Sequence, residues 1–128
     1  MTNRDVYGLA LALLAEGGDR MENGDYEERA GYLLSAFCTE VQEVNRRFCA
    51  VRGEEAPEEF PIYLSLDGEF PVKERFSGAA GAYLASMLVL EEDLELSDRL
   101  FARYCDLITQ ICTELPMRAG KTVNRYGN

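Results

Sequence analysis

The side chains available for chemistry are mainly acids and cysteines, because the chain contains no histidine. Serine and cysteine triads with an imidazole base are therefore excluded, as are zinc and di-iron sites with histidine ligands. Carboxylate, lysine and substrate-assisted reactions remain. Lys73 and Lys121 are the only lysines, and neither lies in an apolar run of the kind that activates an amine.

The strongest candidates for carboxylate chemistry are Glu40 and Glu43, which are three residues apart and would share one helix face. Helical nucleotide pyrophosphohydrolases hold magnesium with such pairs on two helices. A second set would have to come from an acidic cluster at an expected helix break, namely Glu91, Glu92, Asp93 and Glu95. No basic residue beside a phosphate-binding loop accompanies them, so solvated acidic faces are the favoured interpretation. A magnesium-dependent all-α nucleotide pyrophosphohydrolase is kept as an alternative.

The four cysteines are Cys38, Cys49, Cys105 and Cys112. No pair has the Cys-x-x-Cys spacing of a zinc or redox site. Each falls on the apolar side of an expected helix, so we expect buried free thiols that pack as small apolar side chains. These residues predict no metal site and no cofactor.

The length of 128 residues fits one domain, and the net charge of −10 is unevenly spread. Residues 116–128 contain Arg118, Lys121 and Arg125 and no acid, so residues 1–115 carry 10 basic and 23 acidic residues. Such an acidic body repels nucleic acid and anionic membranes. No apolar run is long enough to cross a bilayer, and no secretory signal is evident. We therefore expect an intracellular protein without membrane contact.

Four helices are predicted from apolar spacing of three and four residues. They cover residues 4–16, 25–52, 71–90 and 97–115, the second being about 40 Å long. Thr2 with Asp5 and Asp25 with Glu28 have capping-box spacing, and Ser97 is a candidate N-cap. Gly53 ends the long helix. Small residues dominate positions 77–82, and we expect Gly78 and Gly81 to mark tight helix packing.

An acidic linker with two prolines, residues 53–61, separates the second and third helices. After it, apolar and other residues alternate from Ile62 to Leu66 and end at the Asp67-Gly68 turn, which predicts a strand. A lone strand cannot satisfy its own backbone groups. It must therefore pair with another segment of the chain or with a neighbouring subunit.

The order of these elements resembles that of the small head–tail connector (adaptor, head-completion) proteins of tailed bacteriophages and prophages. The resemblance covers residues 4–115. It rests on a long capped helix, DYEERAGYLLSAFCTEVQEVNRRF, a loop with a small strand, IYLSLDGEFPVKERF, and an alanine- and glycine-rich helical region, SGAAGAYLASMLVLEEDLELSDRLFARYCDLI.

The resemblance implies a mainly α fold of about four helices with a minor β-hairpin element, and no catalytic residues. It also implies a homo-oligomeric ring of typically twelve subunits at the head–tail junction of the virion. The ring would meet the portal protein and a tail-side completion protein, and DNA would pass through it without sequence-specific contact. Candidate interface residues are Tyr63, Asp67, Phe70, Arg118, Lys121 and Arg125. We expect the basic tail, residues 116–128, to be flexible and to order only against another chain.

A different class of function stays open beside this one. Next in order, a small, acidic, helical intracellular protein is also typical of a regulator or adaptor that binds one protein partner as a monomer or dimer. The two hypotheses differ in whether the chain associates with copies of itself.

Overall fold

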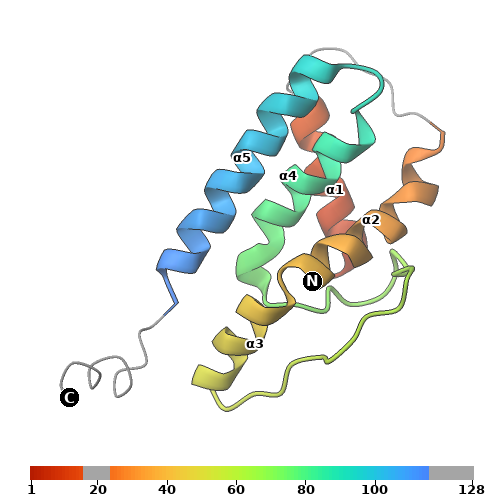
Figure 1. Cartoon of the computed structure of the whole chain (residues 1–128). Coiled ribbons are helices and arrows are strands. Elements are labelled where there is room, and N and C mark those ends of the chain that lie inside the picture. Colours follow the sequence, from red (N-terminus) through yellow and green to blue (C-terminus); the bar gives the residue numbers. More distant parts are fainter. Residues whose placement is uncertain (16–23, 116–128) are drawn as a thin grey trace.

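The computed structural model describes residues 1–15 and 24–115, and this part of the chain is mainly helical, as predicted (Figure 1). None of its helices is long and apolar enough to cross a membrane. The described part holds five α-helices and one short 3-10 helix: α1 (Asn3–Ala15), α2 (Tyr26–Glu40), α3 (Gln42–Val51), η1 (Glu74–Phe76), α4 (Ser77–Leu88) and α5 (Leu94–Thr113). The predicted end of the first helix at residue 16 and the loop that follows it lie outside the described residues.

Helix α4 lies in the middle of the bundle, and α1, α2 and α5 all pack against it (Figure 1). Eight of its twelve residues are alanine, glycine or serine, so neighbouring helices can approach closely. Nine of its twelve residues are buried. A helix that is apolar on every side belongs in the core of a protein, which explains why the chain surrounds this one.

The two α4 glycines have different roles. A methyl group at Gly81 would lie 3.1 Å from the Leu9 Cβ of α1, so the predicted tight packing is confirmed there. Gly78 is exposed and has no atom within 4 Å of its missing Cβ. The prediction of tight packing at Gly78 was therefore wrong.

The predicted long helix is two helices, α2 and α3, which meet at Val41. The Thr39 hydroxyl donates to the Ser35 carbonyl oxygen at 3.0 Å, a bond that often bends helices. The bend lets Asn45 of α3 accept a hydrogen bond from the Lys73 backbone at 3.0 Å. Gly53 follows α3 with a φ of +70°, so the predicted glycine stop is confirmed.

Only one of the predicted helix caps is found as expected. The Thr2 and Asp5 backbone N–H groups donate to each other's side chains at 2.8 and 3.2 Å, and these bonds lower the pKa of Asp5. Asp25 makes no side-chain cap bond. Helix α5 begins before Ser97, because Asp93 accepts a hydrogen bond from the Leu96 N–H at 3.1 Å. Ser97 is instead buried and donates to the Ser86 carbonyl oxygen at 2.8 Å.

The predicted strand at residues 62–66 is absent from the described structure, which contains only an isolated antiparallel bridge between Thr2 and Glu69. The carbonyl oxygens of Leu66 and Gly68 accept hydrogen bonds from the first N–H groups of α1, those of Arg4 and Asn3, at 2.8 and 2.9 Å. A helix leaves these N–H groups without partners. The segment therefore pairs within the chain, and a helix end takes the place of a strand.

Gly31 of α2 holds the same segment from the other side. Its carbonyl oxygen accepts a hydrogen bond from the Leu64 N–H at 3.1 Å. A Cβ at position 31 would lie 2.3 Å from the Tyr63 ring and 2.5 Å from the Leu64 carbonyl oxygen. Only glycine allows this approach, because one of the colliding groups is backbone.

We predict that Gly31→Ala lowers the free energy of unfolding by about 1–3 kcal/mol, since the new methyl group overpacks the contact with Leu64. The matched control is Gly78→Ala, where the methyl group enters open space. It should raise the free energy of unfolding by up to about 1 kcal/mol through better helix propensity. Urea unfolding followed by circular dichroism measures both. Equal effects of the two substitutions would contradict this account of Gly31.

Candidate functional site

The acids considered for magnesium binding do not form one site. Glu40 and Glu43 lie on opposite sides of the break at Val41. Glu40 accepts a hydrogen bond from the Tyr104 hydroxyl at 2.8 Å, whereas Glu43 pairs with Arg46. Among residues 1–15 and 24–115, no group of three or more acids or cysteines could hold a metal ion.

The second acidic cluster is used by the fold. Glu92 accepts a hydrogen bond from the Tyr26 hydroxyl at 2.8 Å, which ties the start of α2 to the turn after α4. Asp93 caps α5.

The Tyr104 hydroxyl that bonds Glu40 has a shifted pKa. Burial raises the pKa of Tyr104, and the hydrogen bond to the Glu40 carboxylate adds to that shift. The Tyr104 hydroxyl is therefore a hydrogen-bond donor across the neutral range.

The cysteines divide into two pairs. Cys38 and Cys49 are buried, as predicted, and burial raises the pKa of Cys38 to about 12. Cys105 and Cys112 are exposed on α5, so the prediction that every cysteine is buried was wrong for these two. The physical reason is that α4 covers only part of the apolar side of α5.

The interface candidates of the loop lie in different environments. Tyr63 is 40% exposed, and its ring meets that of Tyr32 edge-on at 4.9 Å between centroids. Asp67 is exposed and accepts a hydrogen bond from Arg4 at 3.2 Å. Phe70 is buried in the core, whereas its place among the interface candidates required it to lie at the surface. The other candidates, Arg118, Lys121 and Arg125, lie outside the described residues.

Helix α5 has an exposed apolar side. Leu100, Tyr104 and Ile111 are buried, whereas the adjacent side is uncovered. We call this uncovered side the α5 strip, and it consists of Leu94, Phe101, Cys105, Ile108 and Cys112. Leu94 is 62% exposed and Phe101 is 40% exposed, Ile108 is half-buried, and both cysteines are exposed. Their separations of seven, four, three and four residues place them on one face of the helix.

A second exposed apolar group lies on α2 and the loop before α4. We call it the tyrosine patch: Tyr32, Ile62 and Tyr63. Ile62 is 80% exposed and Tyr32 is 56% exposed. Tyr63 fits closely against Gly31, which holds the patch against α2. Tyrosines and apolar side chains of this kind are enriched at the centre of protein interfaces.

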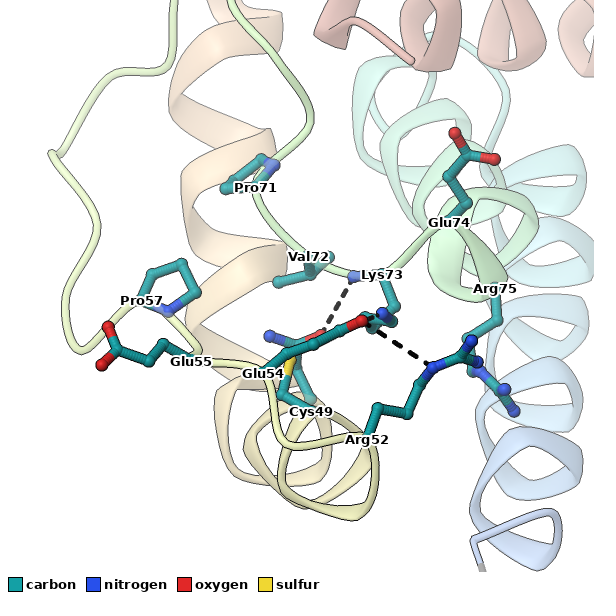
Figure 2. A pocket seen from close by; sticks show the side chains of 11 residues that line it. Cys49, Arg52, Glu54, Glu55, Pro57, Pro71, Val72, Lys73, Glu74 and Arg75 are labelled. Carbon is teal, nitrogen blue, oxygen red and sulfur yellow. Dashed lines mark hydrogen bonds and ion pairs between the residues drawn. The ribbon is translucent and has the colours of Figure 1, made fainter.

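An open cleft of about 530 Å³ lies between α3, the chain after it and η1 (Figure 2). Its walls include both basic and acidic side chains. Lys73 and Glu54 form an ion pair at 2.5 Å, and Arg52 approaches the same carboxylate at 3.7 Å. Arg75 lies 4.0 Å above the Phe48 ring and pairs with Glu114 at 3.2 Å. The charges therefore neutralise one another and fasten the loop to α3.

Sequence patterns alone did not locate the exposed part of α5. The sequence predicts burial of Cys105 and Cys112 because they share the apolar arc of Leu100 and Ile111. The available signal was the width of that arc, which is broader than one packed neighbour can cover.

No family model, curated protein or solved structure matches the chain.

The pairing of Glu54 with Lys73 should make stability depend on pH. The hydrogen bond from Lys73 lowers the pKa of Glu54 from its ordinary value of 4.5. Its stabilising contribution is therefore complete above pH 4.5 and is lost as the pH falls through the lower folded-state pKa. Glu54→Gln should unfold at lower urea than the parent chain at pH 6, and the difference should be smaller at pH 3. An equal difference at both values would contradict the assignment.

Proposed function

We propose that this chain is a structural assembly subunit of the head–tail connector type, which binds copies of itself and neighbouring virion proteins. The observation that carries the proposal is the α5 strip. Leu94, Phe101 and two cysteines are exposed along one side of α5, and exposed apolar side chains gathered on one helix face mark an interaction site more often than singly scattered ones. The mainly helical fold is compatible with the resemblance described above.

The acidic charge of the chain supports the connector form of the proposal. A net charge of −10 opposes adhesion of the DNA backbone, since like charges repel. A ring wall past which DNA must slide benefits from that repulsion. The proposed assembly is thus held by apolar contacts between subunits, while its charged surfaces keep DNA from binding.

We predict that the purified chain forms a discrete oligomer several times heavier than its 14.4 kDa monomer. Size-exclusion chromatography with light scattering, over a range of concentrations, measures this mass. Addition of the portal protein encoded in the same genome should shift the oligomer into a larger complex.

A mass of 14.4 kDa at every concentration, unchanged by the portal protein, would refute the proposal and favour a monomeric adaptor. A dimer unaffected by the portal protein would favour a dimeric regulator. A coding gene outside any capsid, portal and tail gene cluster would count against the connector type in particular.

A further inference from the structure

We infer that the cleft between α3 and η1 is a binding site for a small organic anion, whose carboxylate or phosphate group is held by Asn45, Arg52 and Lys73. This inference goes beyond the proposed assembly and does not depend on it. None of the described residues that line the cleft belongs to the α5 strip or to the tyrosine patch. The cleft volume of about 530 Å³ lies in the usual range of small-molecule sites.

Asn45 carries the polar group that points to a ligand. The residue is only 1% exposed, and it lies on the wall of the cleft. Its Oδ1 accepts a hydrogen bond from the Lys73 backbone N–H at 3.0 Å, so the amide NH2 group must point elsewhere. Within the described part of the chain this NH2 group donates to no acceptor, and it is not enclosed by protein atoms. A donor that opens on a cleft in this way suits an acceptor atom of a bound molecule.

Two cationic side chains lie beside this amide and share one carboxylate. Lys73 pairs with Glu54 at 2.5 Å, whereas Arg52 approaches the same carboxylate only at 3.7 Å through its Nε. Figure 2 shows both side chains directed at Glu54. The Arg52 side chain makes no hydrogen bond to any other described residue. Its guanidinium group therefore keeps the paired N–H donors that match the two oxygens of a carboxylate or a phosphate.

Glu54 takes the position that the anion of a ligand would occupy. It lies on the irregular chain directly after Gly53, and 44% of its side chain is exposed. An ion pair this exposed contributes little free energy. The Glu54 carboxylate can therefore turn toward solvent without a change in α3. An external anion that also accepts a hydrogen bond from the Asn45 amide would replace it.

The remaining walls of the cleft indicate what else the ligand carries. Pro57, Pro71 and Val72 contribute apolar atoms, whereas Glu55 and Glu74 contribute negative charge. These two acids, together with the net charge of −10, disfavour a ligand with several anionic groups. The expected ligand is therefore a compact molecule with one oxyanion group and an apolar part, such as an organic carboxylate or a phosphate monoester.

NMR of the full-length, nitrogen-labelled chain tests the site directly, because the Asn45 NH2 pair gives side-chain signals of its own. The probes are benzoate and phenyl phosphate at constant ionic strength, with inorganic phosphate for comparison. A saturable shift of the Asn45 signals is expected with an organic probe, at lower concentration than with inorganic phosphate. The tighter of the two organic probes identifies the oxyanion. No saturable shift with either organic probe would overturn the inference.

Substitutions separate a ligand site from ion pairs that only fasten the loop. Asn45→Asp keeps an acceptor for the Lys73 N–H and removes the donor, so binding should be lost while circular dichroism shows an intact fold. Arg52→Gln should weaken binding about two- to fivefold, the range of one exposed charge interaction. Arg103→Gln is the matched control, because it removes the same charge from an exposed position on α5. It should bind the probes like the parent chain.

Glu54→Gln distinguishes the two roles most sharply. Removal of the competing carboxylate should tighten probe binding about two- to fivefold. A saturating probe should also raise the urea midpoint of this variant more than that of the parent chain, since a bound ligand stabilises the folded state. Ion pairs that only fasten the loop predict neither effect. Unchanged or weaker binding by Glu54→Gln, or equal losses in Arg52→Gln and Arg103→Gln, would refute the site.

Discussion

The close packing of other helices around α4 is the constraint on which the rest of the structure depends. Because α4 presents mostly alanine, glycine and serine, its neighbours approach nearly to backbone contact, as at Gly81 and Leu9. Helices α1, α2 and α5 are placed by this contact. A helix with larger side chains at the centre would push them apart and alter the positions of both surface patches.

The loop before α4 depends on that arrangement as well. Its backbone is held by the first turn of α1 and by Gly31 of α2, two elements that come together because both pack on α4. The charged cleft adds a third attachment through Lys73 and Glu54. An irregular segment thereby acquires a defined position, and Ile62 and Tyr63 are presented outward from a fixed base.

Helix α5 serves two purposes because its apolar arc is wider than its contact with α4. One part of the arc completes the core through Leu100, Tyr104 and Ile111. The remainder is the α5 strip. Tyr104 connects the two parts, since its ring contacts Phe37 and Tyr83 in the core and also Phe101 at the surface. A shared aromatic contact of this kind keeps the strip rigid, which lowers the entropic cost of binding a partner.

The sequence by itself determined the helical class, the first turn of α1, the stop at Gly53 and the absence of imidazole chemistry. These features follow from local spacing or composition. Only the tertiary structure decided the break at Val41, the start of α5 at Leu94, the burial of Phe70 and the role of Gly31. Each of these depends on a distant partner. The exposure of Cys105 and Cys112 had the same origin, because periodicity shows which side of a helix is apolar but not how much of that side a neighbour covers.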